Sequence, residues 1–228
     1  MCDSPETLKL RKNYRDALRT IKDKIINLGT NQIEPCDVQN AGICQQSLSL
    51  EDDRKRPYFF VPFEKEYIPT DEIEYHIYDE SNENHINWGD MNFGDLFDLD
   101  YNWTVSFTCP APVDTGLPHM KCIMDTTDIN GDDRLTQGEL ISIINIMVGR
   151  LKTKSLRPHV VAPVMVYSVM GPAHLRVLEA YYNGQHLVVR KTELYDMRDF
   201  NPALITLLTK WWLGYAVGET KTLTPPAP

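Results

Sequence analysis

The sequence contains no hydrophobic run that is long enough to cross a bilayer. Its longest apolar stretches are VVAPVMVYSVM and ISIINIMV, whereas a transmembrane helix needs about 20 predominantly apolar residues. The first residues, MCDSPETLKLRKNYRDAL, become charged before an apolar signal-peptide segment could form. We therefore expect a soluble, cytoplasmic protein without a membrane partner.

Cysteine is scarce, and its spacing has neither a disulfide nor a zinc-binding pattern. The five cysteines are Cys2, Cys36, Cys44, Cys109 and Cys122. Their number is odd and no two form a C-x-x-C pair, which favours reduced thiols over disulfides or structural zinc. This pattern agrees with a cytosolic protein.

The sequence also lacks the short motifs that identify several large enzyme classes. It has no glycine-rich phosphate loop, no G-x-S-x-G nucleophile elbow, no His-rich metal spacing and no internal repeat. At 228 residues with 42% hydrophobic residues, the chain is long enough to bury a core as one domain. Its function therefore has to be inferred from its charge pattern and from one acidic segment.

The net charge of -9 is distributed unevenly along the chain. Residues 1–28 carry seven Lys or Arg against four acids, residues 29–149 carry six against twenty-three, and residues 150–228 carry ten against five. Such asymmetry favours separate surfaces, one for a polyanion and one for a cation. The alternative is that acidic loops only keep the chain in solution, since charge runs are usually solvated faces.

We expect a single domain over residues 1–228 with an α+β fold. Its core, at 119–215, is predicted to be an antiparallel sheet of at least three strands packed against amphipathic helices. Residues 1–28 are predicted to form a basic amphipathic helix, residues 29–118 an acidic, aromatic and irregular insertion, and residues 216–228 a frayed tail.

The predicted N-terminal helix has clear start and stop signals. Ser4 can cap it, Pro5 suits its first turn, and Gly29 follows its end. Its apolar face at helical spacing consists of Leu10, Tyr14, Leu18, Ile21, Ile25 and Leu28. Much of the remaining surface is basic and consists of Arg11, Lys12, Arg15, Arg19, Lys22 and Lys24. That surface can follow phosphates, although a solvated helix exterior has the same pattern.

Further segments have the composition of strands or of a helix. EYHIY at 74–78 and WTVSFTC at 103–109 are rich in aromatic and β-branched residues, and residues 160–170 form an apolar run. An Asn-Pro pair and a later glycine predict a terminal helix over 201–214. Together these segments predict strands before residue 174 and a helix after residue 192.

An Asn-Gly pair predicts a two-residue hairpin turn between strands at 174–182 and 185–192. The paired residues would be Tyr182 with Gln185, Tyr181 with His186, Ala180 with Leu187, and Leu178 with Val189. In this register Glu179 and Arg190 are diagonal neighbours on the face that lies opposite the apolar one. We interpret that face as solvent-exposed, with a catalytic face as the alternative.

The run DTTDINGDDRLTQGEL at 125–140 is the densest concentration of side-chain oxygens in the chain. Four residues fit positions 1, 3, 5 and 12 of the EF-hand template, and these are Asp128, Asn130, Asp132 and Glu139. Asp133 stands at position 6, where the template favours glycine, and no second loop of this kind follows. A calcium site is therefore one interpretation of this run.

Helix capping is a second interpretation of the same run. Thr136 and Glu139 have the spacing of a capping box at the start of a predicted helix over 136–153. The apolar stripe of that helix would consist of Leu140, Ile143, Ile144, Met147 and Leu151. One cap needs only one or two acids, so capping leaves the upstream acids unexplained.

A third interpretation comes from resemblance. The string RPHVVAPVMVYSVMGPAHLRVLEAYYNGQHLVVRKTELYDM is preceded by DINGDDRLTQGEL and followed by KWWLG. Over about residues 118–215 the overall sequence pattern resembles that of the arginine-containing cyclodipeptide synthases of filamentous fungi. The resemblance implies an enzyme of secondary metabolism that joins arginine from arginyl-tRNA to an amino acid from a second aminoacyl-tRNA as a cyclic dipeptide. It also places the family's acidic motif, and hence the catalytic residues, at Asp132, Asp133 and Glu139.

The chemistry of such a reaction agrees with the charge pattern. A guanidinium is always protonated and is held best by carboxylates. Joining two aminoacyl esters needs a general base for the amine and a donor for the developing oxyanion, and the esters are already activated, so no cofactor is expected. Further substrate contacts are predicted at Asp128, Asn130, Glu179 and Arg190. Two basic clusters are predicted to contact tRNA, namely Arg11, Arg15 and Arg19, and Lys152, Lys154 and Arg157.

The alternative function is that of a non-enzymatic calcium-binding or interaction protein that uses the loop at 128–139. In that case Ca²⁺ would be the bound cofactor, and the aminoacyl-tRNAs would not be partners. Neither alternative includes DNA as a partner.

Overall fold

The fold is known from a computed structural model that describes residues 4–65 and 93–222. The predicted strand EYHIY at 74–78 lies outside these residues. Among the residues described, no helix combines the length and the apolar character that a membrane span requires.

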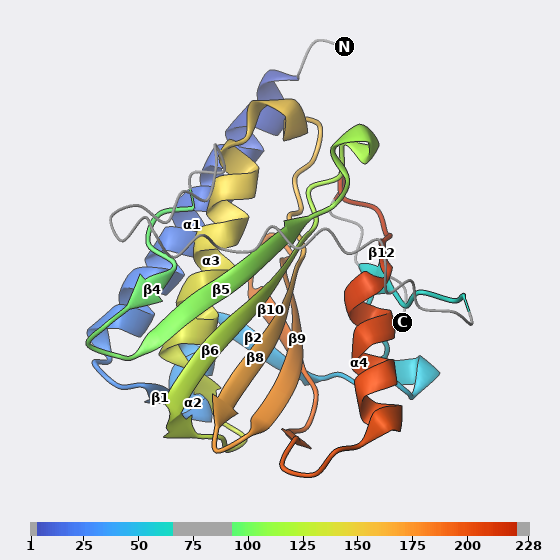
Figure 1. Ribbon diagram of the computed structural model, residues 1–228. Helices are drawn as coiled ribbons and strands as arrows, with labels where there is room; N and C mark the ends of the chain where they lie inside the picture. The colour runs from blue at the N-terminus through green and yellow to red at the C-terminus, as the bar shows by residue number, and fades with distance from the viewer. Residues whose placement is uncertain (1–3, 66–92, 223–228) are drawn as a thin grey trace, which may run out of the picture.

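The α+β fold is confirmed, and its centre is one eight-stranded mixed sheet (Figure 1). In spatial order the strands are β2 (Ile43–Ser47), β10 (Leu187–Lys191), β9 (His174–Tyr182), β8 (Val164–Gly171), β6 (Met120–Asn130), β5 (Trp103–Pro110) and β4 (Phe97–Asp98). A short strand, β11 (Tyr195–Asp196), pairs with the start of β9. Most neighbours run antiparallel, but β2 with β10 and β6 with β8 run parallel. The predicted strands at 103–109 and 160–170 correspond to β5 and β8.

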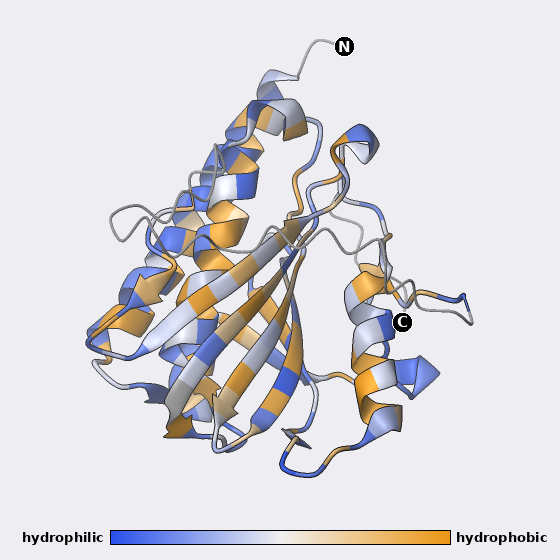
Figure 2. Cartoon of the chain, viewed as in Figure 1, coloured by the Kyte–Doolittle hydropathy of each residue, from blue (hydrophilic) through white to orange (hydrophobic). Residues whose placement is uncertain are grey.

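Two helices are stacked on one face of this sheet. The first is α1 (Pro5–Asn27), which packs against α3 (Gln137–Lys152), and α3 in turn packs against β5, β6 and β8. The side chain of Ser4 caps α1, and the predicted capping box of Thr136 and Glu139 is present at the start of α3. Because α3 lies between α1 and the sheet, it is buried on every side from Gln137 to Leu151 and not only along one stripe. Figure 2 shows hydrophobic residues along α3 and the central strands, and a more mixed surface on α1.

The helix α4 (Pro202–Leu213) covers the opposite face, as Figure 1 shows. Tyr167 of β8 points to that face and donates its hydroxyl hydrogen to the carbonyl of Leu208 at 2.8 Å. The indole nitrogen of Trp211 donates to the carbonyl of Leu50 at 3.1 Å. The predicted terminal helix is therefore confirmed, and Trp211 belongs to the core.

The prediction that residues 29–118 form an irregular insertion is wrong for the part that the structure describes. That part contains α2 (Pro35–Ala41), three strands of the main sheet (β2, β4 and β5), and β1 (Gln32–Ile33) and β3 (Phe60–Val61), which pair elsewhere. It also contains short 3₁₀ turns at Asp53–Lys55 and Val113–Thr115. Apart from β5, which was predicted, these strands have two to five residues and are too short to show a periodic pattern. In addition, β2 pairs with a strand about 140 residues away.

The predicted fraying from residue 216 is also wrong as far as residue 222. The strand β12 (Tyr215–Ala216) pairs with β3. Beyond it, the carbonyl of Thr220 accepts hydrogen bonds from the backbone N–H groups of Val160 and Val161, at 2.8 and 3.0 Å. This part of the tail is therefore fixed to the core.

The hairpin between β9 and β10 has a longer turn than predicted. Leu187 lies opposite Tyr182 and Arg190 opposite Glu179, which shifts the predicted register by two residues. The turn spans four residues because the side chain of Asn183 accepts two backbone N–H groups within it. A shift of two residues keeps every side chain on its predicted face, since strand side chains alternate with a period of two.

Candidate functional site

The three predicted catalytic carboxylates point to three different cations. Glu139 is fully buried, and its two oxygens accept hydrogen bonds from the guanidinium of Arg176 at 2.7 and 2.6 Å. One of the same oxygens also accepts the backbone N–H of Thr136 at 2.8 Å, which completes the capping box. With no exposed surface and both oxygens occupied, Glu139 cannot contact a substrate in this structure, so its prediction as a catalytic residue is wrong.

Arg176 links Glu139 to the loop that carries the other two acids. Its side chain has no exposed surface. It also donates to the carbonyl of Asp132 at 3.1 Å and to that of Arg134 at 2.7 Å. The buried pair therefore holds the backbone on both sides of Asp133 against the start of α3.

Asp132 has a local partner. Its carboxylate accepts hydrogen bonds from the side chain of Arg134 at 2.8 and 2.6 Å, and these bonds lower the pKa of Asp132. The Arg134 guanidinium also donates hydrogen bonds to the side-chain oxygens of Glu34, at 2.8 Å, and Gln32, at 2.7 Å. Asp132 thus belongs to a surface network that connects the loop to the segment around β1.

Asp133 is the most accessible of the three acids. Its side chain is 91% exposed and pairs with the ammonium of Lys191, whose own side chain is 7% exposed. The same ammonium donates to the backbone carbonyl of Asp133 at 2.7 Å. Both residues lie at the edge of a cavity.

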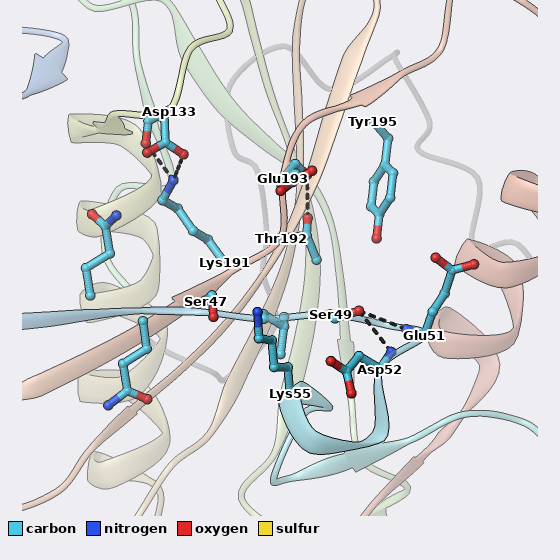
Figure 3. A pocket seen from close by; sticks show the side chains of 13 residues that line it. Ser47, Ser49, Glu51, Asp52, Lys55, Asp133, Lys191, Thr192, Glu193 and Tyr195 are labelled. Carbon is cyan, nitrogen blue, oxygen red and sulfur yellow. Dashed lines mark hydrogen bonds and ion pairs between the residues drawn. The ribbon is translucent and has the colours of Figure 1, made fainter.

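This cavity has a volume of about 540 Å³ and is the site with the richest chemistry in the described part of the chain (Figure 3). Its lining comes from residues 45–55, from the Asp133 loop and from residues 191–195. The charged groups are Glu51, Asp52, Asp133, Glu193, Lys55 and Lys191. Four carboxylates against two ammonium groups give a formal charge of -2, and Lys191 is already paired. A volume of this size fits a small molecule.

The phenol of Tyr195 lines the same cavity as the carboxylates of Glu51 and Glu193. Figure 3 shows the Tyr195 hydroxyl pointing into the space between Thr192 and Glu51. Burial raises the pKa of Tyr195, and the negative charges of Glu51 and Glu193 raise it further, while a hydrogen bond with Thr192 acts in the opposite direction. Tyr195 therefore keeps its proton at neutral pH and can donate it.

The loop on the other side of the cavity is held by its own hydrogen bonds. The Ser49 hydroxyl accepts the backbone N–H groups of Glu51 and Asp52, at 3.2 and 3.0 Å. Asp52 pairs with Arg54, which lowers the pKa of Asp52. The carboxylates of Glu51 and Glu193 have no side-chain partner among the described residues, which leaves them available to a ligand.

Among the residues that line this cavity, only Asp133 was predicted from the sequence as a site residue. The signals were present, since EDDRKRP at 51–57 and KTELYD at 191–196 are both rich in charge. What joins them is the parallel pairing of β2 with β10, which brings the two segments side by side.

The calcium template does not have the surroundings of an EF-hand. The segment before the loop is the strand β6, which contains Asp128 and Asn130, where an EF-hand has a helix. The side chain of Asp128 lies outside what the structure describes. Among the described residues, no group of three or more His, Cys, Asp or Glu is placed to hold a metal ion.

Glu179 and Arg190 form a buried pair and not the solvent-exposed face that we predicted. Their oxygen and nitrogen are 2.8 Å apart, and neither side chain is more than 2% exposed. Burial raises the pKa of Glu179, and the backbone N–H of Phe59 and the Arg190 guanidinium oppose this rise. Arg190 also stacks on Tyr58 at 3.7 Å. The pair anchors the chain around residues 55–59 to the sheet. Because both side chains are buried there, their position does not agree with the predicted contact with a substrate.

The basic residues divide into structural and accessible ones. Arg11 is buried and donates to the carbonyls of Leu151 and Leu156, at 2.7 and 2.6 Å, near the end of α3. Its predicted role as a phosphate contact is therefore wrong. Arg19 pairs with Asp16, and Lys154 is exposed in a separate 3₁₀ turn.

The remaining basic residues meet in one groove. Its volume is about 300 Å³, and it is lined by Leu8, Arg11, Lys12, Arg15, Leu151, Lys152 and Arg157. Four residues of the two predicted clusters, Arg11, Arg15, Lys152 and Arg157, are thus brought together between α1 and the end of α3. Arg11 is buried, and Arg15 is partly exposed and donates to the carbonyl of Leu151 at 3.1 Å. We call this feature the basic groove.

Comparisons of the chain with protein-family models, with curated proteins and with solved structures find no match. The acidic cavity beside Asp133 and the basic groove are therefore the features of the molecule that bear on its function.

Proposed function

We propose that the protein is a tRNA-dependent cyclodipeptide synthase of the cytoplasm that forms a cyclic Arg-Xaa dipeptide from arginyl-tRNA and a second aminoacyl-tRNA. The observation that carries this proposal is the acidic cavity beside Asp133. Its formal charge of -2 and its volume of about 540 Å³ suit the cationic side chain of an arginyl group.

The available carboxylates have distinct places in this proposal. Glu51 and Glu193 accept the guanidinium, because carboxylates bind its planar donors in pairs of hydrogen bonds. Asp133, at the edge of the cavity and already paired with Lys191, takes the proton from the attacking amine. Tyr195, which remains protonated, donates to the oxygen on which negative charge develops.

The reaction consists of two aminolysis steps. The α-amine of one aminoacyl group attacks the ester carbonyl of the other, an amide bond forms, and one tRNA leaves with the proton on its terminal hydroxyl. The free amine of the dipeptidyl ester then attacks the remaining ester, so that a second amide closes the ring and the second tRNA leaves. Both steps need a neutral amine and a stabilised oxyanion, and neither needs an oxidant or a nucleotide.

The position of the basic groove also supports this proposal. It lies where α3 ends, whereas the acidic cavity adjoins the loop where α3 begins. A helix of 16 residues is about 24 Å long, so one substrate that uses both sites has to be larger than an amino acid. Arginyl-tRNA has a cationic arginyl group at one end and phosphates along its acceptor arm. Its cationic end suits the acidic cavity, and its phosphates suit the basic groove.

The test is metabolite analysis of cells that express the chain, followed by an assay with labelled arginyl-tRNA. We expect a new cyclic dipeptide that contains arginine, and we expect Glu51→Gln combined with Glu193→Gln to remove it. Asp114→Asn, at an exposed position outside the cavity, is the matched control and should leave the yield unchanged. Soluble wild-type protein that yields no such product in either assay would refute the proposal.

A further inference from the structure

The strand β2 forms one edge of the main sheet, and its pairing shows which backbone groups face outward. The backbone N–H of Leu187 donates to the carbonyl of Gly42 at 3.2 Å, and that of Leu48 donates to the carbonyl of Lys191 at 2.7 Å. Successive residues of a strand direct their backbone groups to opposite sides. The even-numbered residues of β2 therefore face β10, and Gln45 and Ser47 present their N–H and C=O groups away from the sheet.

This outward edge borders the acidic cavity. Gln45, Gln46 and Ser47 are all among its lining residues. In the described part of the chain, β2 pairs only with β10, so no strand covers the outward backbone groups of Gln45 and Ser47. Proteins usually protect such an edge because unpaired N–H and C=O groups bind another extended chain readily.

We infer that this edge binds the main chain of the aminoacyl or dipeptidyl group by pairing it with the N–H and C=O of Gln45. The ligand is thus held as a short added strand while its side chain reaches Glu51 and Glu193. Its identity as an arginyl group rests on the proposed function, whereas the edge itself follows from the strand register. Strand addition of this kind obtains affinity from the main chain and specificity from side-chain pockets.

The size and charge of the cavity favour this occupant over a strand from a second protein. A volume of about 540 Å³ is that of a small-molecule site. The carboxylates of Glu51 and Glu193 lie near Tyr195, within the same cavity, and favour a cation. A short ligand with a main-chain amide and a guanidinium satisfies both features at once.

The experiment uses Nα-acetyl-argininamide as the probe and the full chain as the receptor. Gln45→Pro removes the outward N–H, and an edge strand tolerates proline where that N–H bonds to no other strand. Gln45→Ala removes the same side chain but keeps the N–H. We expect calorimetry to show that Gln45→Pro binds the probe about three- to tenfold more weakly than Gln45→Ala, as the loss of one hydrogen bond predicts. Equal affinities of the two variants would overturn the inference.

A second comparison needs no variant and covers the case in which Gln45→Pro does not fold. n-Butylguanidine keeps the guanidinium with the same single charge but lacks the main-chain amides, so wild-type protein should bind it more weakly than it binds Nα-acetyl-argininamide. Equal affinities, or no binding of either compound, would overturn the inference. Gln46→Pro should unfold the sheet edge, because that N–H faces β10.

The outcomes also separate this inference from the proposed function. Tight probe binding that depends on the Gln45 N–H, without any cyclic dipeptide, would support the edge site and refute the synthase. Formation of the dipeptide at equal rates by Gln45→Pro and Gln45→Ala would support the synthase and overturn the edge site.

Discussion

The guanidinium of Arg176 contacts both carboxylate oxygens of Glu139, at 2.7 and 2.6 Å, and neither side chain has any exposed surface. Arg176 also binds two carbonyls of the loop that carries Asp133. Glu139 therefore acts on this loop through Arg176 and not on a substrate. Of the three predicted catalytic acids, Glu139 thus holds the loop in place, and Asp133 is the most accessible to a ligand.

The first prediction concerns the stability of this pair. Glu139→Gln should lower the free energy of unfolding by about 3–5 kcal/mol, because it leaves the Arg176 charge buried without its partner. Urea denaturation measures this change. Asp133→Asn is the matched control, and as an exposed pair member it should cost no more than about 1 kcal/mol. A Glu139→Gln variant as stable as wild type would show that the pair does not hold the fold.

The second prediction separates the catalytic and calcium interpretations at Asp133. If Asp133 acts on the substrate, Asp133→Gly and Asp133→Asn should each lower product formation at least about a hundredfold, as expected for loss of a general base. In a calcium loop the same position favours glycine, so Asp133→Gly would instead strengthen metal binding. Product yield with and without a chelator measures the difference. Full activity of Asp133→Gly, or loss of wild-type activity in chelator, would contradict the catalytic interpretation.

The parts of the fold that sequence predicts well are those with local chemical signals. Ser4, the capping box of Thr136 and Glu139, and Asn201 mark the starts of α1, α3 and α4, and the structure has caps at all three. A cap needs only residues within one turn, so its signal does not depend on the tertiary fold.

The parts that sequence does not predict depend on distant pairing. The strand β2 has five residues and pairs with β10, and β6 contains Asp125 and Asp128 although it lies inside the sheet. The burial of Arg11 could not be predicted from the sequence either, because a basic residue at a helical surface position normally faces solvent. Its partners are backbone carbonyls at the end of another helix, and no sequence pattern identifies them.

The same limit explains the outcome at the candidate site. Asp133 can be identified from sequence because it lies in a dense acidic run, whereas Glu51 and Glu193 come from segments 142 residues apart (193 minus 51). Their common cavity exists only once β2 and β10 pair.

The third prediction concerns the pH dependence of stability. Burial lowers the pKa of His119 to about 4 from its usual 6.5, and its Nε2 donates to the carbonyl of Val217 at 2.8 Å. Because the folded pKa lies below the unfolded one, the unfolded chain binds more protons between these values. The stability due to neutral His119 is therefore complete above pH 6.5 and is lost as the pH falls towards 4.

Between about pH 7 and about pH 4.5 this loss should amount to about 2 kcal/mol, since each pKa unit corresponds to about 1.4 kcal/mol. Urea denaturation at the two pH values measures it. His119→Gln cannot titrate, so its stability should fall less over the same range. An equal fall in the variant and in wild type would assign the pH dependence to other groups.

The fourth prediction concerns the basic groove. Arg15→Gln combined with Lys152→Gln should weaken tRNA binding, and it should reduce the slope of log affinity against log salt by about 0.7–0.9 for each phosphate that the groove no longer neutralises. Lys9→Gln, exposed on the same helix outside the groove, removes a charge without touching the groove and should leave that slope unchanged. Arg11→Gln should instead destabilise the fold, because the buried guanidinium holds carbonyls near the end of α3. Filter binding at several salt concentrations measures the slope, and denaturation measures the stability. A slope that responds equally to Lys9→Gln and to the double variant would mean that tRNA detects only the net charge of the chain, whereas a response confined to the double variant would locate the phosphates in the groove.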